Sequence, residues 1–513
     1  MSELLRSPAI RRVEAAATGS LPPGTLMSRA ADAVVDVAAR LARSLEAGRP
    51  IVAWIGPGNN GGDALLAALR LRAFGFDARA IALDAQRAPG SDAGEIWRRA
   101  RSERFPIESA DAWQTLFAAP PRAPIVIDGL FGTGLQRPLG ADVAALCERI
   151  AERGWPVVAV DVPSGIDADT GARLGSIAIR AQVTVTMIAD KPGLHTAAAL
   201  DHAGDVRVAD LGIEPERRQA ALGAASADDR GRLFDREQAR AAALSPRAND
   251  TSKGSFGSVL CYGGASGMHG AVLLAARGAQ AIGVGRIYIA TPAGELFDPG
   301  QPQWMSAAAD AAFARFDAVA IGCGLGESDP ARAAVRRAVA EARALVVDAD
   351  ALNAIAADEA LADALAARAG AWRCIATPHP LEAARLLQVD VPRIQSDRIG
   401  AARALAARLR CVVLLKGAGS VVATPVGRWS IIDAGSPALA SAGTGDVLAG
   451  ACAALLARGL DGERAACLGA WLHGEAGSQW THAHGTADGL SVAKLHEWIR
   501  GAAAGLRSHE ESR

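Results

Sequence analysis

Short apolar segments alternate with segments of helical periodicity along most of the chain, and this alternation constrains the fold more than any other feature. In the first part of the sequence the strand-like segments are 51–55, 78–83, 124–130, 156–162 and 183–188. Helical patterns such as 63–75 and 140–153 lie between them. This order is typical of a mostly parallel, doubly wound α/β sheet with helices on both faces.

The alternation stops at a charged stretch, residues 212–250, and then begins again. We expect no strand in that stretch, and it contains the predicted domain boundary. A hairpin is predicted over 420–433. The other strand-like segments of the second set are 258–262, 286–290, 318–324, 344–350, 374–378 and 411–417. Because a chain of 513 residues is long for a single core, the sequence predicts two different α/β domains, at 1–220 and 232–507.

Charge and composition exclude several classes of partner. The formal net charge is −1, without a long basic run, so we expect no nucleic acid and no membrane surface as a partner. The apolar run VLAGACAALLA after Asp446 is too short to span a bilayer, and charged residues from Glu3 to Glu14 leave no signal-peptide core. The seven cysteines form no C-x-x-C pair, which indicates buried, reduced thiols in a cytoplasmic protein.

The stretch GPGNNGGD, Gly56 to Asp63, follows the first strand-like segment and leads into a helix. Its Gly56-x-Gly58-x-x-Gly61 spacing permits a tight turn and leaves amides that favour a pyrophosphate. The spacing alone also fits a dehydrogenase, with Asp84 as the candidate ribose ligand, or a glycine-rich turn that only packs a helix on a strand. The absence of Lys-Ser/Thr after the glycines excludes a Walker loop.

Two further loops follow strand-like segments, at the edge where open parallel sheets bind ligands. In DGLFGTGLQRPLG, Asp128 offers a carboxylate base beside backbone donors, and Arg137 can meet a phosphate. In VDVPSGIDADTG, Asp161 and Ser164 stand at another strand end. Asn60, Asp128 and Ser164 together offer hard oxygen ligands of low total charge, which suit an alkali ion better than zinc. Taken singly, Asp128 and Ser164 are also explained as a turn cap and a helix cap.

In the second half, the stretch SAGTGDVLAG at 441–450 begins a helix. The amides of Gly443, Thr444 and Gly445 can hold a negative phosphoryl group, and Asp446 supplies a carboxylate beside them. A nest of donors and one base are what phosphoryl transfer to a hydroxyl needs. The alternative is that Asp446 only stabilises the first turn of the helix.

Other polar loops are expected beside this stretch. LLKGAGSVV places Lys416 between a strand and the hairpin, while GGASGMHGA (263–271) and GCGLG (322–326) are glycine-rich turns after strands. TPHPLE places His379 and Glu382 at a strand-to-helix junction. A lone histidine at such a junction is more often a packing or capping residue than a catalyst.

The motifs of the first half, with the KPG at 191–193, resemble the NAD(P)H-hydrate epimerase (YjeF amino-terminal) domain over about residues 10–213. The resemblance implies a Rossmann-like fold that epimerises hydrated NADH or NADPH at nicotinamide C6. It assigns potassium binding to Asn60, Asp128 and Ser164, and Asp128 is also the candidate for proton transfer. The residues implied to bind the hydrate are Asn59, Asn60, Gly61, Gly62, Asp63, Gly132, Thr133, Gly134, Leu135, Gln136, Arg137, Pro138 and Asp161. Ala64 departs from the family's usual glycine without removing a ligand group.

The motifs KGSFGSVL, GCGLG, DADALN, TPHPLE, KGAGS and GTGD resemble the ADP/ATP-dependent NAD(P)H-hydrate dehydratase domain, a ribokinase-like fold, over about residues 235–505. Departures from the usual pattern are Cys323 for proline, Leu381 for glycine and Ser420 for threonine. The residues implied to contact the adenine nucleotide are Lys416, Gly417, Ala418, Gly419, Ser420 and Gly445. Those implied to contact the hydrate are Ala271, Gly324, His379 and Asp446.

The second resemblance implies that Asp446 is the base that activates the C6 hydroxyl. ADP would phosphorylate this hydroxyl with release of AMP, and elimination of phosphate would restore the dihydronicotinamide, with Mg²⁺ accompanying the nucleotide. The predicted function is therefore the repair of hydrated NADH and NADPH by a cytoplasmic homo-oligomer. Two alternatives are a vitamin or sugar kinase fused to a dinucleotide-sensing module, and an amino-terminal domain that serves only in binding or assembly.

Overall fold

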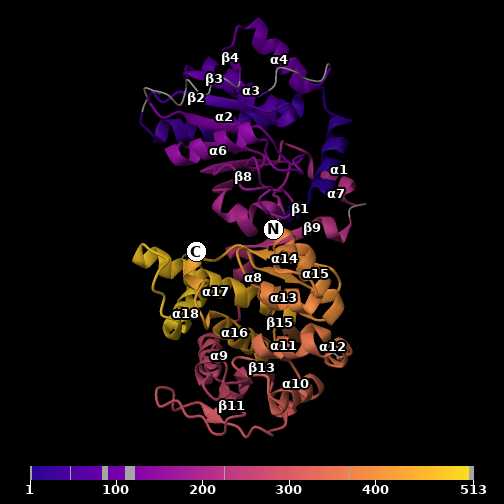
Figure 1. The fold of residues 1–513 in the computed structure, drawn as a ribbon, viewed down its shortest axis with the longest axis vertical. Coiled ribbons are helices and arrows are strands. Elements are labelled where there is room, and N and C mark those ends of the chain that lie inside the picture. Colours follow the sequence, from indigo (N-terminus) through magenta and orange to yellow (C-terminus); the bar gives the residue numbers. More distant parts are fainter. Residues whose placement is uncertain are drawn as a thin grey trace. The chain divides into compact units, whose positions relative to one another are not determined.

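A computed structural model describes residues 3–46, 48–83, 90–109, 122–223, 226–368 and 370–507, and the candidate ribose ligand Asp84 lies outside them. The chain divides into two compact units, one formed by Glu3–Gly231 and the other beginning at Arg232. Each unit is an α/β layer structure in which helices flank a central sheet (Figure 1). Within the described residues, none of the helices is both long and apolar enough to cross a membrane.

The amino-terminal unit contains a parallel sheet of seven strands in the order β4-β3-β2-β5-β6-β7-β8, which confirms the predicted doubly wound fold. The strands are β2 (Ile51–Ile55), β3 (Ala78–Ala82), β4 (Ile107–Ser109), β5 (Ile125–Gly129), β6 (Val157–Val160), β7 (Val183–Met187) and β8 (Asp205–Ala209). The order reverses between β2 and β5, and a crevice at their carboxyl ends is the expected ligand site of such a sheet.

Helices cover both faces of this sheet. Along β2, Ile51, Ala53 and Ile55 belong to one apolar core, whereas Val52 and Trp54 belong to the core on the other face, as the two-residue period of a strand requires. The principal helices are α1 (Ser7–Thr18), α2 (Thr25–Ser44), α3 (Asn59–Ala73), α4 (Asp92–Ser102), α6 (Ala141–Arg153) and α7 (Pro215–Leu222). The short strand β1 (Glu3–Leu5) precedes them.

Helix α3 begins four residues earlier than the periodicity suggests, at Asn59, because glycines in its first turn allow close approach. A Cβ atom on Gly61 would lie 2.2 Å from the carbonyl oxygen of Gly56, and one on Gly62 would lie 2.6 Å from the terminal methyl group of Met27. The departure at Ala64 is accommodated by Gly129, since a Cβ there would meet that of Ala64 at 2.3 Å.

The carboxy-terminal unit contains a mixed sheet whose strands run in the order β9-β18-β17-β16-β15-β14-β13-β10-β11-β12. From β16 to β12 all neighbours are parallel, and β16–β17 and β17–β18 are antiparallel, which confirms the predicted hairpin. The strands are β9 (Arg230–Phe234), β10 (Ser258–Tyr262), β11 (Arg286–Ala290), β12 (Met305–Ser306), β13 (Ala318–Ile321), β14 (Leu345–Val347), β15 (Cys374–Ala376), β16 (Val412–Leu415), β17 (Val421–Ala423) and β18 (Trp429–Ile432).

The expectation that residues 212–250 contain no strand is wrong. Strand β9 lies in this stretch and pairs with β18 in parallel, from Arg232 opposite Ser430 onward. Its sequence RGRLF shows no alternation, and only Leu233 and Phe234 are buried apolar residues. The strand is therefore defined by its pairing with the hairpin rather than by a local pattern.

Helices pack on both sides of the carboxy-terminal sheet (Figure 1). Helices α9 and α16 approach so closely that a Cβ on Gly450 would lie 1.8 Å from the Ala275 oxygen, and one on Gly278 would lie 1.9 Å from the Val447 oxygen. The helices are α8 (Arg236–Ala242), α9 (His269–Ile282), α10 (Asp329–Glu341), α11 (Ala349–Ala357), α12 (Glu359–Ala366), α13 (Pro380–Leu387), α14 (Val391–Ser396), α15 (Arg398–Leu409), α16 (Thr444–Ala457), α17 (Gly462–His484) and α18 (Leu495–Gly505). All seven cysteines are buried free thiols, as predicted.

Candidate functional site

A cavity of about 1150 Å³ opens at the carboxyl ends of β2, β5 and β6, where the sheet order reverses. This volume lies at the upper end of the range of small-molecule sites and is large enough for a dinucleotide. The predicted residues that line it are Asn59, Asn60, Asp63, Gly132, Thr133, Gly134, Leu135, Gln136, Arg137 and Asp161. Gly61, Gly62 and Pro138 were predicted with them but do not line this cavity.

The first helix, α1, supplies a wall of the cavity that the sequence motifs do not reveal. Its Ile10, Arg11, Glu14 and Thr18 line the cavity, together with Met27 at the start of α2. The amphipathic pattern of α1 marks it as a packed helix, but no local signal in the sequence indicates that its polar side chains face a cavity.

Asp161 is the carboxylate most firmly fixed in the cavity wall. It follows β6 with a left-handed backbone (φ 70°), and its Oδ2 accepts a hydrogen bond of 3.2 Å from the Thr133 amide. Its Oδ1 lies 2.7 Å from Nζ of Lys191, whose side chain is 1% exposed, compared with 13% for Asp161. Lys191 also donates to Thr186 Oγ1 at 2.7 Å and to the Met187 oxygen at 3.0 Å. The buried lysine therefore orients a carboxylate that reaches the cavity.

Three other acids, Glu14, Asp63 and Asp92, line this cavity with Asp161. Burial and the charge of Asp161 raise the pKa of Glu14 and hold the pKa of Asp63 well above its ordinary value. Like charges in a poorly solvated site disfavour the ionised forms of Glu14 and Asp63. The cavity therefore combines an ion-paired carboxylate with two carboxyl groups whose protonated forms are favoured more than those of exposed acids.

Asp128 lies beneath the cavity rather than in its wall. It is fully buried at the end of β5, and it accepts hydrogen bonds from the Ser164 hydroxyl at 2.7 Å, the Ser164 amide at 2.8 Å and the Leu130 amide at 3.2 Å. Burial raises its pKa to about 6, and these hydrogen bonds act in the opposite direction. All three donors are neutral groups, so a bound cation would compensate the buried charge.

The residues predicted to bind potassium carry side-chain oxygens that suit an alkali ion. Asp128 and Ser164 are in direct contact, and the Asn60 side chain lies beside the Gly132 backbone, where a Cβ would stand 3.3 Å from its Oδ1. Among the described residues, the buried Nδ2 of Asn60 has no hydrogen-bond partner. One carboxylate with amide and hydroxyl oxygens is a hard, weakly charged ligand set, in keeping with an alkali ion.

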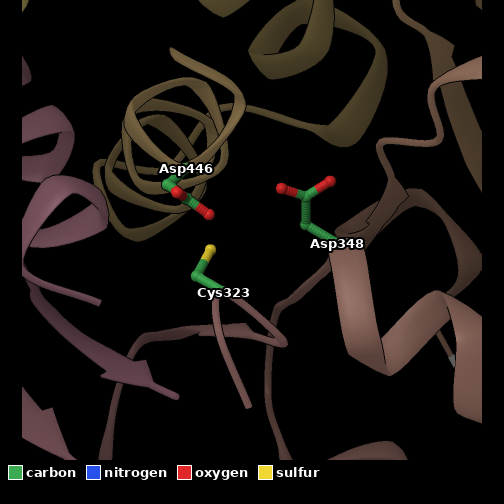
Figure 2. A group of neighbouring side chains, drawn as sticks. All are labelled: Cys323, Asp348 and Asp446. Atoms are coloured by element: carbon green, nitrogen blue, oxygen red, sulfur yellow. The ribbon is translucent and has the colours of Figure 1, made fainter. Parts of the chain in front are cut away.

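In the carboxy-terminal unit, three side chains from separate elements converge beneath the start of α16. Figure 2 shows Cys323 after β13, Asp348 after β14 and Asp446 in the first turn of α16, all pointing toward one another. Their ligand atoms lie within 4.8 Å of one another. Burial, and then the charge of Asp348, raises the pKa of Asp446 to about 6, and a hydrogen bond with the Cys323 thiol opposes this shift.

Lys416 is paired with Asp348, a residue absent from the predicted site. Its Nζ lies 2.6 Å from Asp348 Oδ1, which also accepts a 2.9 Å hydrogen bond from the Thr377 hydroxyl. Here the aspartate is 2% exposed and the lysine 18%. Burial alone would lower the pKa of Lys416, but Asp348 and Glu382 reverse the effect and the pKa is raised. Lys416 is thus a fixed cation.

The predicted nucleotide residues come together around Lys416. A Cβ on Gly445 would lie 3.3 Å from Lys416 Nζ, so the first turn of α16 touches the lysine. The helix begins after Gly443, whose φ of 95° turns the chain into the helix. In the loop after β16, the Ser420 hydroxyl donates to the Gly417 oxygen at 3.1 Å. The lysine, the loop and the first turn of the helix therefore lie together and offer hydrogen-bond donors to an anion.

Two of the predicted hydrate contacts lie side by side, and a third is a helix cap. A Cβ on Gly324 would lie 2.9 Å from that of Ala271. His379 caps α13, its Nδ1 accepting from the Leu381 amide at 3.1 Å, while Glu382 accepts from the His379 amide at 2.8 Å. Burial raises the pKa of Glu382 to about 7, although Lys416 lowers it.

Comparisons with known proteins match both units. A family described as YjeF-related protein N-terminus matches residues 23–193, and a family described as NAD(P)H-hydrate dehydratase matches residues 259–500. The bifunctional NAD(P)H-hydrate repair enzyme Nnr of Gloeobacter violaceus is 36% identical over 506 residues, which cover 95% of each chain. The enzyme of the same name from Escherichia coli is 33% identical over 450 residues, or 85% of this chain and 82% of that protein.

A crystal structure of the ADP/ATP-dependent NAD(P)H-hydrate dehydratase from Bacillus subtilis, obtained with ATP/Mg²⁺, is 30% identical, covers 54% of this chain and 99% of that chain, and has a TM-score of 0.48. The full-length relatives carry both halves in one chain, which favours the repair function over a kinase fused to a sensing module. The chain therefore belongs to the family of bifunctional NAD(P)H-hydrate repair enzymes, with an epimerase domain and an NAD(P)H-hydrate dehydratase domain.

Proposed function

We propose that the cavity of the amino-terminal unit binds hydrated NADH or NADPH and interconverts its two C6 epimers. The ring nitrogen beside C6 can expel the hydroxyl group as water once that group is protonated, and water can then add to the opposite face. Each direction needs one group that gives a proton and one that takes it. Asp161 lines the cavity and Asp128 does not, so we assign the proton transfer to Asp161. Glu14 and Asp63 are the carboxyl groups that share the proton with it.

Asp128 then serves the cation rather than the substrate. We propose that Asn60, Asp128 and Ser164 hold potassium, which would supply the positive charge that a buried carboxylate with three neutral donors lacks. Ser164 Oγ also accepts from the Phe131 amide at 3.1 Å, so the ligand set is joined to the loop that lines the cavity. In this arrangement the cation site fixes the loop formed by Gly132 to Arg137, which faces the dinucleotide.

We propose that the carboxy-terminal site dehydrates one epimer with ADP as the phosphoryl donor. Asp446 takes the proton of the C6 hydroxyl, whose oxygen then forms a bond to the terminal phosphorus of ADP as the bond to AMP breaks. Departure of phosphate from C6, with transfer of a C5 proton to the released phosphate, restores the double bond. Lys416 and the amides of Gly443 to Gly445 stabilise the charge on the transferred group. His379, Gly324 and Ala271 are assigned to the hydrate.

Magnesium would accompany the nucleotide and neutralise part of the phosphate charge. The carboxylate oxygens beside Lys416 and α16 suit Mg²⁺, whereas the thiol of Cys323 does not. We propose that Asp348 is the carboxylate that holds Mg²⁺, because Asp446 is needed as the base. The cytoplasmic location and the homo-oligomeric state stay predictions.

The observation that carries this assignment is the Lys416–Asp348 pair of 2.6 Å held against the first turn of α16, next to Asp446. The test is to mix the protein with hydrated NADH and ADP and to follow the return of the absorbance of reduced nicotinamide. We expect complete recovery from a mixture of both epimers. Recovery that stops when one epimer is consumed would contradict the epimerase assignment. Phosphorylation of a vitamin alcohol without recovery would contradict the dehydratase assignment.

A further inference from the structure

Arg398, the first residue of α15, is a cation buried where the amino-terminal end of that helix meets β16. Its side chain is 1% exposed. Burial lowers the pKa of its guanidinium group to about 10, so the group is charged at neutral pH. A buried guanidinium is costly unless its N–H groups are used, and its hydrogen bonds therefore indicate what it stabilises.

The guanidinium group lies against the backbone of the loop after β16. Its Nη2 donates to the carbonyl oxygens of Lys416 at 3.2 Å and Leu415 at 3.4 Å, and its Nη1 donates to Gln395 Oε1 at 2.9 Å. A Cβ atom on Gly417 would lie 2.8 Å from both Nη atoms. The planar group thus occupies the inner side of the turn that begins at Lys416.

The turn itself can exist only with glycine at its second position. Gly417 has a φ of 138°, which is unfavourable for residues with a side chain, and the guanidinium leaves no room for one. Arg398 and Gly417 consequently fix the direction in which the chain leaves β16. That direction determines where the Lys416 side chain starts and where the amides of residues 417–420 point.

We propose that Arg398 is a positioning residue for the adenine nucleotide, because it fixes the Lys416–Ser420 loop from its buried side. The role rests on the proposed placement of ADP on that loop. Its contribution is to hold the loop in the binding conformation before the nucleotide arrives, so that no affinity is lost in ordering the loop. The expected signature is weaker binding of ADP without weaker binding of the hydrate.

The test compares Arg398→Lys and Arg398→Met with the unmodified chain in the dehydratase assay. Lysine keeps the charge but cannot contact two carbonyl groups and Gln395 in the same plane, and methionine removes the charge as well. We expect the KM for ADP to rise about ten- to a hundredfold, the range for loss of hydrogen bonds from a charged group. The KM for the hydrate should stay within about twofold, which is less than the loss of one neutral hydrogen bond.

A matched control is Arg368→Lys. Arg368 also donates to main-chain carbonyls, among them that of Ala342 at 2.7 Å, but these lie at the end of α10 and not in the site. We expect this variant to lose some thermal stability and to keep its KM for ADP. Epimerisation by the same chains reports on the integrity of the other unit.

Two further variants separate the possible failures. Ala418→Glu places a negative charge on the exposed part of the loop, and an unchanged KM for ADP in this variant would show that the proposed nucleotide site is wrong. Gly417→Ala disturbs the same contact from the loop side, so the inference can be tested even if Arg398→Met does not fold. If Ala418→Glu weakens ADP binding while Arg398→Lys and Gly417→Ala do not, the positioning role is overturned. A parallel rise in both KM values would overturn it too.

Discussion

Both units place a lysine–aspartate pair at the carboxyl edge of a parallel sheet, but they expose opposite partners. In the amino-terminal unit the lysine is 1% exposed and Asp161 13%, whereas in the carboxy-terminal unit Asp348 is 2% exposed and the lysine 18%. The buried partner orients the group that faces the site. One site therefore presents a carboxylate, which suits proton transfer to and from a hydroxyl group or water, and the other presents an ammonium group, which suits a phosphoryl group.

The two units also differ in where they place the aspartate that is not paired with a lysine. In the epimerase the additional aspartate, Asp128, lies beneath the site with neutral donors around it. In the dehydratase the additional aspartate, Asp446, stands in the site at the start of a helix. In the proposed mechanisms, the ion-paired aspartate is the reactive one in the epimerase, whereas the aspartate without the lysine partner is the reactive one in the dehydratase.

The largest effect is expected for Asp446→Asn. Asparagine has nearly the same shape but cannot accept the proton of the C6 hydroxyl, so ADP-dependent return of NADH should fall about 10²- to 10⁴-fold. Epimerisation by the same chain should stay normal and serves as the control. If dehydration is retained, Asp446 only caps the helix and its assignment as base is wrong.

The next effect is expected for Asp161→Asn, which should slow epimer interconversion by about 10²-fold or more while changing the KM for the hydrate little. The assay follows the approach of the two epimers to equilibrium without ADP. Asp128→Asn provides the contrast, because Asp128 is proposed to act through the cation and its loss should be offset in part by high potassium. If Asp161→Asn interconverts the epimers at the normal rate, another group must transfer the proton.

A smaller effect is expected for Asp348→Asn. Because Asp348 orients Lys416 and is also the carboxylate proposed to hold Mg²⁺, the variant should raise the KM for ADP and the Mg²⁺ concentration required about tenfold, and should lower kcat less, as for weakened positioning of a charge. Steady-state kinetics at saturating hydrate separate the two constants. A loss of kcat as large as that of Asp446→Asn would show that Asp348 takes part in the chemical step itself.

The smallest effect is expected when potassium is replaced by lithium in the epimerase assay. Lithium is too small for a ligand set of one carboxylate with amide and hydroxyl oxygens, so interconversion should slow several-fold. Dehydration of the pure reactive epimer should be unaffected, since the predicted ligands Asn60, Asp128 and Ser164 all belong to the other unit. Equal epimerisation rates in both salts would contradict the assignment of these three residues as potassium ligands.

Glycine spacings and strand-end carboxylates predict much of both sites, since strand ends of a parallel sheet meet at one edge. The sequence could not show which member of each lysine–aspartate pair is buried, because burial depends on packing between distant segments. Lys191 belongs to a motif whose lysine has no evident role until its 2.7 Å contact with Asp161 is seen. Glu14 enters the cavity from α1, before the family match begins at residue 23, and β9 is defined only by its partner strand.

The close approach of α9 and α16 has a consequence for how the dehydratase can vary. The proposed base, Asp446, stands on the first turn of α16, and the same helix touches the Ala275 carbonyl one turn later, where a Cβ on Gly450 would lie 1.8 Å away. Any larger residue at Gly450 or Gly278 must move the helix and therefore the base. We therefore expect substitution at either glycine to impair dehydration, although neither is among the residues proposed to contact a substrate. Neutral drift in this unit is expected to occur on the outer helices instead.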